Sequence, residues 1–397
     1  MNIGMILDCE FPPDLRVEQE MLTLAKLGFD VHLLCYDFTF QRPDVERFDK
    51  GITIHRIKVS KKFHGKFNAL ALSLPIYFAF WKKHVKKFIN QNKIAVIHVH
   101  DLRLAQAGYW ASKKFNIRYI LDLHENYPAA LRFYAFTNSF PGKLFISFKQ
   151  WEKYERNQVQ KADGIVAVIE EMAERLYSLG VTRDKIFIVP NYINVDSFDQ
   201  NVIKTKIDKK EDEIFLFYSG GFDRHRGLET LIHAMKHIQP INPKIKLHLV
   251  GSGRTESDLR EKVDRLNLNN VTFHGWQQER AIPSFIEAID IGIVPHLKNA
   301  HTDSTIPHKL FQYLYKQKPV VVSNCNPLKR LVEEMHSGLV FESCNDKDLA
   351  EKILSLVENP ELQLIMSKNG YDSIIKKYNW KTSGEELKKL YEKISTS

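Results

Sequence analysis

Short apolar runs rich in β-branched residues recur along the whole chain, and amphipathic or polar stretches separate them. Such runs alternating with helical patterns predict parallel sheets with helices on both faces. The runs expected to form strands are 3–7, 31–36, 52–57, 95–100, 119–124, 164–169, 186–190, 214–219, 245–251, 271–275, 291–295, 319–323 and 338–341. We therefore predict an α/β protein with two tandem doubly wound Rossmann-like domains that face a central cleft.

Chain length supports this division, because 397 residues exceed the size at which a single core stops growing. We place the first domain at 1–190 and the second at 191–379. The highly charged segment 201–213 is expected to be a linker or a surface excursion between domains. A final helix at 380–397 carries an apolar stripe and is expected to pack back on the first domain.

Cysteine usage and motif spacing argue against a metalloprotein. The four cysteines show no CxxC spacing, and the chain has no HExxH motif, so we predict reduced thiols and no tightly held metal. The first residues lack the apolar core of a signal peptide, and the apolar run 69–81 is too short to span a bilayer and contains Pro75. We expect a cytoplasmic protein, soluble or peripheral on the cytoplasmic membrane face.

Positive charge is concentrated in the first domain. The net charge is +9, and the stretch from Lys50 to His100 contains ten lysines and Arg56 but no Asp or Glu. Mixed lysines and aromatics in Lys58–Phe88 predict attachment to an anionic membrane surface. A core helix at Leu70–Trp81 with solvated lysines at its flanks is the alternative. Nucleic-acid binding would require an exposed aromatic platform as well, and is not favoured.

A Gly- and Arg-rich corner follows the strand expected at 214–219. Gly220 and Gly221 permit a tight turn, and Arg224 and Arg226 stand where the next helix begins. Helix N-termini attract anions, and a guanidinium suits a diphosphate because it offers planar paired donors. The corner therefore predicts a diphosphate site, although an ordinary turn with solvated charges remains an alternative.

A second signal lies in 303–324, where Lys309 stands at the start of an expected helix. A cation there is locally unfavourable, so a bound phosphate or a carboxylate such as Glu287 should compensate it. The Gly-Ser-Gly turn at Gly251 is a weaker signal, because the complete GxGxxG spacing of dinucleotide sites is missing.

Strand ends in the first domain also carry polar groups. His124 and Glu125 follow the strand expected at 119–124, and His98, His100 and Asp101 form a similar group one strand earlier. His124 is expected either to donate a hydrogen bond to a sugar hydroxyl or to exchange a proton. A purely structural histidine is the alternative.

Together these motifs resemble glycosyltransferase family 4, which has the GT-B architecture. The resemblance covers nearly the whole chain, is densest from Ile186 to Phe341, and rests on segments in family order: 122–126, 188–198, 218–232, 248–253, 271–277 and 306–324. It implies metal-independent transfer from a UDP-, GDP- or other nucleotide sugar, with retention and without a further cofactor. The implied acceptor is a glycan or a polyprenyl-linked molecule, met from the first domain, in cell-surface polysaccharide or glycolipid assembly.

The resemblance also implies residue roles. His124 would contact the transferred sugar, Asp303 is the candidate for a missing catalytic carboxylate, and Arg16 and Glu125 would contact the acceptor or a phosphate. The diphosphate set is Gly220, Gly221, Arg224, Arg226 and Lys309, and the nucleoside set is Gly251, Gly275, Trp276 and Gln312.

Four departures from the family pattern stand out. Gly221 and Arg226 stand where the family has Arg and Lys, and Gln312 replaces the glutamate that holds the ribose. Ser304 replaces the glutamate eight residues earlier, beside Asp303, and 10–18 replaces a Gly-rich loop, where Arg16 is expected to supply charge. A nucleotide-sugar epimerase or a degenerate sugar-nucleotide-binding module therefore remain alternatives.

Overall fold

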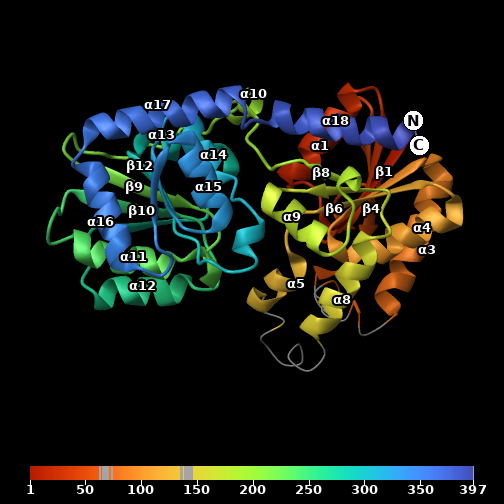
Figure 1. The fold of residues 1–397 in the computed structure, drawn as a ribbon, viewed down its shortest axis with the longest axis horizontal. Coiled ribbons are helices and arrows are strands. Elements are labelled where there is room, and N and C mark those ends of the chain that lie inside the picture. Colours follow the sequence, from red (N-terminus) through yellow and green to blue (C-terminus); the bar gives the residue numbers. More distant parts are fainter. Residues whose placement is uncertain (62–63, 65–70, 73–74, 135–136, 138–145, 397) are drawn as a thin grey trace. The chain divides into compact units, whose positions relative to one another are not determined.

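The computed structural model describes residues 1–61, 64, 71–72, 75–134, 137 and 146–396 (Figure 1). The chain forms two compact units. Met1–Pro190 and Ser383–Ser397 make up the first unit, and Asn191–Thr382 make up the second. Each unit contains one sheet covered by helices, which confirms the predicted α/β class with two doubly wound, Rossmann-like sheets.

The sheet of the first unit has eight strands in the order β3-β4-β2-β1-β5-β6-β7-β8. Every neighbouring pair is parallel except β3 and β4. The strands are β1 (Asn2–Glu10), β2 (Asp30–Asp37), β3 (Val45–Asp49), β4 (Ile52–Lys58), β5 (Val96–His100), β6 (Arg118–Leu123), β7 (Gly164–Ala167) and β8 (Ile186–Ile188). The strand order reverses between β1 and β5, so the edge formed by their carboxyl ends is the expected ligand-binding edge.

β3 was not expected from the sequence. Its side chains alternate between exposed and half-buried, and it pairs only with β4, antiparallel and at the sheet edge. A strand that buries neither face lacks the apolar signal used to find the others.

Helices of the first unit include α1 (Leu15–Lys26), α3 (Ile76–Asn92), α4 (Ala105–Phe115), α5 (Tyr127–Ala130), α8 (Phe148–Val159), α9 (Glu170–Ser178) and most of α18 (Trp380–Thr396). The stripe expected on α18 is buried: Leu387, Leu390 and Tyr391 are fully inaccessible to solvent. A Cβ on Gly164 of β7 would lie 2.5 Å from Leu390 Cδ1, so this helix packs directly on the sheet.

The second unit has six parallel strands in the order β11-β10-β9-β12-β13-β14. They are β9 (Ile214–Ser219), β10 (Ile245–Val250), β11 (Val271–Gly275), β12 (Ile291–Val294), β13 (Val320–Ser323) and β14 (Gly338–Phe341). Its helices include α10 (Val195–Phe198), α11 (Leu228–Ile238), α12 (Glu256–Arg265), α13 (Ile282–Ala288), α14 (Lys309–Tyr315), α15 (Asn326–Met335), α16 (Asp346–Val357) and α17 (Pro360–Lys376). Here the order reverses between β9 and β12.

The charged segment 201–213 does not link the two units, contrary to one expectation from the sequence. It lies inside the second unit as a surface excursion. Its backbone is held at Ile203, whose N–H donates to the carbonyl of Arg280 and whose carbonyl accepts from the Ser284 hydroxyl. Lys209 forms an ion pair with Asp290. The low apolar content of this segment predicted a position on the surface, but it did not predict which elements of the second unit the segment packs against.

We predict that Gly251→Ala destabilises the second unit strongly. Gly251 has φ +137°, and an added Cβ would lie 1.9 Å from the carbonyl oxygen of Gly220. We expect a loss of at least about 3 kcal/mol in the free energy of unfolding, measured by urea denaturation. Gly28→Ala is the control, because Gly28 has φ +88° but nothing within 4 Å of the added Cβ, and should cost about 1–2 kcal/mol. Equal losses in both variants would contradict the close approach of the two loops.

Candidate functional site

Three loops of the second unit meet at the carboxyl ends of β9, β10 and β11. Gly220 N–H donates to the carbonyl of Val250 over 2.9 Å, and Gly251 N–H donates to the carbonyl of Gly275 over 2.8 Å. A Cβ on Gly253 would lie 2.5–2.7 Å from backbone atoms of Phe222. The backbone of one loop therefore packs directly on the backbone of the next, which explains why the turn requires glycine at Gly251 and at Gly253.

Arg226 is held next to the end of β12. Its Nη1 lies 3.3 Å from His296 Nε2, and its buried Nε has no hydrogen-bond partner in the part of the chain that the structure describes. The following Gly227 has φ +70°, and a Cβ there would lie 1.8 Å from the carbonyl oxygen of Pro295. The α11 N-terminus thus approaches the β12 end closely and carries Arg226 to the point where the strand order reverses.

Lys309 is the first residue of α14 and is only 8% exposed. Its Nζ lies 3.5 Å from the centre of the Tyr218 ring and would be 2.9 Å from a Cβ on Gly220. Burial, reinforced by the charge of Arg226, holds the pKa of Lys309 well below its usual value. Glu287, the carboxylate considered as its partner, instead pairs with Lys316 over 2.9 Å.

No carboxylate in the described part of the chain lies within ion-pair distance, 4.0 Å, of Arg226 or Lys309. The remaining titratable neighbours are histidines. Burial lowers the pKa of His225 to about 3 and of His301 to about 4, and lowers that of His296 well below its usual value. The structure therefore gathers Arg226, Lys309 and three imidazoles of lowered pKa, with no carboxylate of the described residues in ion-pair contact with either basic side chain, an environment suited to a phosphate.

His296 and His301 were missed by the sequence analysis. They follow β12 directly, so their position after a strand at the reversal of strand order was the available signal. Single histidines after a strand are common, and only the fold brings these two to Arg226.

The other residues predicted in the second unit differ in their surroundings. Gln312 is 7% exposed, and its amide has no hydrogen-bond partner among the described residues, whereas Trp276 after β11 is 70% exposed. Arg224 and Gly221 are exposed. Asp303 accepts a hydrogen bond from the backbone N–H of Asn326 over 2.7 Å, so its carboxylate already caps the start of α15.

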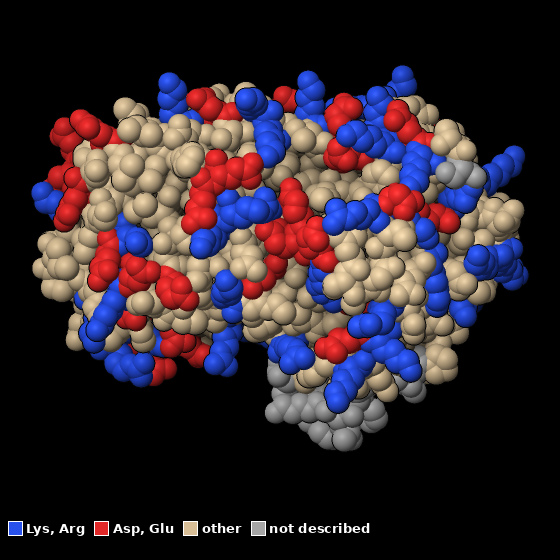
Figure 2. Space-filling model, viewed as in Figure 1, with Lys and Arg blue, Asp and Glu red and all other residues tan. Residues whose placement is uncertain are grey.

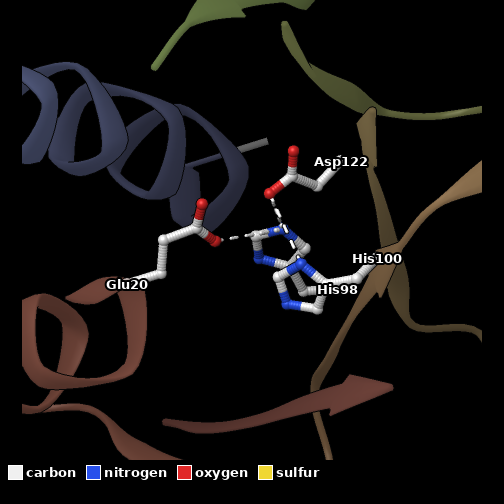
Figure 3. A group of neighbouring side chains, drawn as sticks. All are labelled: Glu20, His98, His100 and Asp122. Carbon is white, nitrogen blue, oxygen red and sulfur yellow. Dashed lines mark ion pairs between the residues drawn. The ribbon is translucent and has the colours of Figure 1, made fainter. Parts of the chain in front are cut away.

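In the first unit, a buried group of polar side chains lies between α1 and the strands β5 and β6. Figure 3 shows Glu20, His98, His100 and Asp122 pointing toward one another. His98 Nε2 lies 3.8 Å from Glu20 Oε2 and 3.6 Å from Asp122 Oδ2, and His100 Nδ1 lies 3.5 Å from Asp122 Oδ2. All four are fully buried.

Arg16 does not take the predicted position of an acceptor or phosphate contact. It is 5% exposed, and its Nη2 lies 3.0 Å from Glu20 Oε1 and 3.2 Å from Asp122 Oδ1. Its Nη1 donates to the carbonyl of Val189. The guanidinium is therefore the counter-ion of two buried carboxylates, and it faces inward because α1 presents Arg16 and Glu20, one turn apart, to the sheet.

Ligand atoms of Glu20, His98, His100 and Asp122 lie within 4.8 Å of one another, a separation that raises the question of a metal ion. The guanidinium of Arg16 already contacts both carboxylates. A divalent ion about 4 Å from that guanidinium would be repelled by about 8 kcal/mol at an effective dielectric constant of about 20. We therefore interpret the group as an ion-pair cluster whose cation is Arg16.

His124 and Glu125 follow β6 at the edge of this cluster. His124 Nε2 lies 3.5 Å from Asp122 Oδ2 and His124 Nδ1 lies 3.9 Å from Asp101 Oδ1. Burial lowers the pKa of His124, but Asp101 and Asp122 outweigh it and raise the value to about 10. Burial raises the pKa of Glu125 to about 7, although the Tyr134 hydroxyl donates to its Oε1.

We predict that Arg16→Met lowers the free energy of unfolding by about 3–5 kcal/mol. Methionine fills similar volume but leaves Glu20 and Asp122 buried beside each other without the guanidinium that contacts both. Urea denaturation followed by circular dichroism measures the loss. Arg47→Met, on an exposed position of β3, is the control and should change stability by less than about 0.5 kcal/mol. Similar behaviour of the two variants would contradict the counter-ion role.

Comparisons with known proteins cover both units. Residues 17–197 match the family model described as Glycosyltransferase Family 4, and residues 199–373 match the model described as Glycosyl transferases group 1. An uncharacterized glycosyltransferase of Methanocaldococcus jannaschii is 24% identical, over 96% of this chain and 94% of that protein. Phosphatidyl-myo-inositol mannosyltransferase of Mycobacterium leprae is 21% identical, over 100% of this chain and 98% of that protein.

Among solved structures, sucrose-phosphate synthase of Thermosynechococcus elongatus is similar in fold. Its TM-score is 0.77 at 19% identity, covering 100% of this chain and 99% of that one. None of the helices in the described residues combines the length and hydropathy that a bilayer-spanning segment requires.

Proposed function

This chain belongs to glycosyltransferase family 4 and is a glycosyltransferase with the GT-B architecture, and from that membership we propose that it transfers a sugar from a nucleotide-diphosphate donor to a glycan or lipid-linked acceptor. The proposal includes retention at the anomeric carbon and a place in cell-surface polysaccharide or glycolipid assembly. The Mycobacterium leprae relative is named for a lipid, phosphatidyl-myo-inositol, and this name supports the lipid-linked option.

One observation carries the proposal: Arg226 and Lys309 lie beside the strand reversal of the second unit and have no carboxylate partner in the described residues. Sugar transfer releases a nucleoside diphosphate, whose negative charge grows in the transition state. Cations held in place by the protein stabilise that charge, and removal of one such donor costs about 3–4 kcal/mol. These two side chains supply positive charge where other enzymes use a metal, so we propose metal-independent transfer.

The nucleoside would be held by neighbouring residues of the same unit. Gln312 lies on α14, three residues after Lys309, and its amide is available to a ribose hydroxyl. Trp276 is exposed directly after β11 and offers a flat face to the base, and Gly275, with φ +68° and no atoms near its missing side chain, leaves room beside it. In the first unit, His124 would contact the transferred sugar.

Attachment to a membrane from the cytoplasmic side is proposed for the first unit. Part of Lys58–Phe88 lies outside the described residues, but α3 is described and carries Lys82, Lys83, Lys86 and Lys87 without an acidic residue. Lys82 and Lys114 lie over the Trp110 ring of the neighbouring α4, at 5.9 and 5.3 Å. Figure 2 shows Lys and Arg side chains, in blue, along the edge where Figure 1 draws these two helices. Trp81 is fully buried, so the apolar side of α3 belongs to the core.

We predict that nucleoside diphosphates stabilise the protein through Arg226 and Lys309. At a concentration of about 100 Kd, the correct diphosphate should add about 2.7 kcal/mol, or about 5–10 °C in Tm. Arg226→Ala and Lys309→Met should each remove most of this shift in a thermal-shift panel of UDP, GDP, ADP and their sugars. The exposed Arg280→Ala is the control and should retain it.

Two further variants sharpen this test. Lys309→Met removes a buried amine that has no carboxylate partner among the described residues, so the unliganded variant should be at least as stable as the natural protein, and lost binding would not reflect unfolding. Gly221→Arg restores the family's arginine at an exposed position where an added Cβ meets only Asp223 Oδ2 at 3.5 Å, and should raise affinity about tenfold. Unchanged shifts in the Arg226 and Lys309 variants would disprove the site, and labelled-donor transfer and hydrolysis assays would separate an enzyme from a binding module.

We predict that diphosphate binding takes up protons when it is measured at about pH 8, above the second phosphate pKa of about 6. Burial and then Arg226 lower the pKa of Lys309 in the free protein, and a bound anion favours the charged amine, so binding raises that pKa. Affinity should therefore fall as the pH rises. Calorimetry in buffers of different ionisation enthalpy measures the uptake, since the second phosphate pKa of about 6 makes the nucleotide itself fully ionised. Lys309→Met should show no uptake, and the same uptake in that variant would assign the proton elsewhere.

We predict binding to anionic vesicles at low salt through α3. Replacing the exposed Lys83, Lys86 and Lys87 by Gln should weaken binding about 100-fold, at about 1 kcal/mol for each lysine. Vesicle flotation is the measurement. Lys388→Gln with Lys389→Gln is the control, because these lysines of α18 pair with Glu392 and Glu386. Absence of binding by the natural protein would exclude the membrane proposal and leave the transferase proposal intact.

A further inference from the structure

Asp122 is the one carboxylate that four basic side chains of the buried cluster share. Arg16 Nη2 lies 3.2 Å from its Oδ1, and its Oδ2 lies 3.5–3.6 Å from ring nitrogens of His98, His100 and His124. The parallel register of β5 and β6 places His100 directly beside Asp122. Alternation along a strand puts His98 on the same face as His100, and His124 follows Asp122 by two residues. The sheet itself therefore sets this arrangement.

Asp122 is the ionised member of the cluster. Burial raises its pKa, but the Arg16 guanidinium and then His124 outweigh that effect, and the pKa lies well below its usual value. Glu20 behaves oppositely, because burial and the neighbouring Asp122 raise its pKa well above the usual value. The two carboxyl groups therefore differ: Asp122 keeps its charge to a lower pH than an ordinary carboxyl group, and Glu20 takes up a proton more readily than one.

His124 has a carboxylate near each of its ring nitrogens. Asp122 lies 3.5 Å from Nε2, and Asp101 lies 3.9 Å from Nδ1. A neutral imidazole carries one N–H and could turn a hydrogen toward only one of these carboxylates, whereas an imidazolium carries two. His100 Nδ1 lies 3.1 Å from His124 Nε2. Burial lowers the pKa of His100 and so favours a neutral ring, whose Nδ1 can accept a hydrogen bond from a protonated Nε2 of His124.

The other charged groups near His124 do not reverse this balance. From α1, Arg16 opposes a second positive charge, but it is itself paired with Asp122 and Glu20. Glu20, when protonated, contributes no charge, and Glu125 beside His124 adds a negative charge where it is ionised. Asp101 has φ +69° and ψ +148°, a backbone conformation unusual for residues other than glycine, and its carboxylate is less buried than that of Asp122.

We propose that Asp122 is a positioning residue that, together with Asp101, holds His124 as an imidazolium with one N–H toward each carboxylate, so that His124 places a positively charged ring against the transferred sugar and does not serve as a general base. This inference rests on the proposed function for the identity of the sugar. The charge state and orientation of His124 belong to the first unit and can be measured without a substrate. An imidazolium has no free lone pair, so the proton of the acceptor hydroxyl must leave to another group, such as an oxygen of the departing diphosphate.

NMR of the full chain labelled at histidine rings tests the charge state directly. Loss of one ring signal in His124→Gln assigns the resonance. We expect His124 in the natural protein to remain protonated up to at least about pH 8, and its pKa to fall by about 2 units or more in Asp122→Asn. Asp101→Asn, at a less buried carboxylate, should lower the pKa by a smaller amount and provides the same test if Asp122→Asn does not fold.

Tyr391→Phe is the matched control. The Tyr391 hydroxyl lies 2.8 Å from His98 Nδ1, so this variant perturbs the same cluster from α18 without removing a contact of His124. It should leave the pKa of His124 unchanged within about 0.3 units. A comparable shift in Tyr391→Phe and Asp122→Asn would show a general disturbance and overturn the positioning role.

Two other results would overturn the proposal. A His124 that titrates near its ordinary pKa of about 6.5 in the natural protein would make it a proton-exchanging histidine. Zinc bound at one equivalent after purification would make Asp122 a metal ligand instead, if EDTA removes the zinc and at the same time shifts the histidine ring signals.

If a donor is found, Asp122→Asn should lower kcat at least about tenfold with little change in donor KM. The kcat of this variant should also depend on pH near neutrality, where that of the natural protein does not. If no donor is found, the transferase proposal fails while the NMR result still decides this one.

Discussion

Two basic side chains without a carboxylate partner among the described residues, Arg226 and Lys309, are the feature on which the proposed chemistry of the second unit depends. Burying an amine beneath a tyrosine ring and next to a guanidinium is unfavourable in the free protein, and the lowered pKa of Lys309 expresses that cost. A bound diphosphate would offset the repulsion between the two basic groups. The contacts that would bind the ligand are therefore the same ones that destabilise this region of the free protein.

The first unit treats charge differently. Arg16 is buried as deeply as Lys309 but contacts two carboxylates, and its pKa is raised, with Asp122 and Glu20 overcoming burial. A compensated cluster of this kind is rigid and holds its members in fixed positions, whereas an uncompensated pair invites a ligand. A buried basic side chain is therefore paired as a counter-ion in the first sheet and left without a carboxylate partner among the described residues in the second, and neighbouring carboxylates make the difference.

Particular residues show how far sequence patterns reached. The apolar runs located every strand except β3, whose side chains are exposed or half-buried and so carry no apolar signal. The corner at Gly220 and the helix start at Lys309 were recognised because each has a local pattern. Arg16 was assigned to a phosphate, since nothing local indicates that Glu20 and Asp122 enclose it. Asp303 was chosen for its spacing alone, and the structure uses its carboxylate to cap α15.

The sequence by itself determined the class of fold and the family, because apolar periodicity and the order of glycine, proline and basic motifs are properties of neighbouring residues. Only the tertiary structure decided which charges are neutralised. That outcome depends on pairs such as Arg16 with Asp122, 106 residues apart, and Tyr391 with His98, 293 residues apart, which meet only when strands align and α18 returns to the first sheet. Electrostatic environment is set by distances in space, and a linear pattern does not contain them.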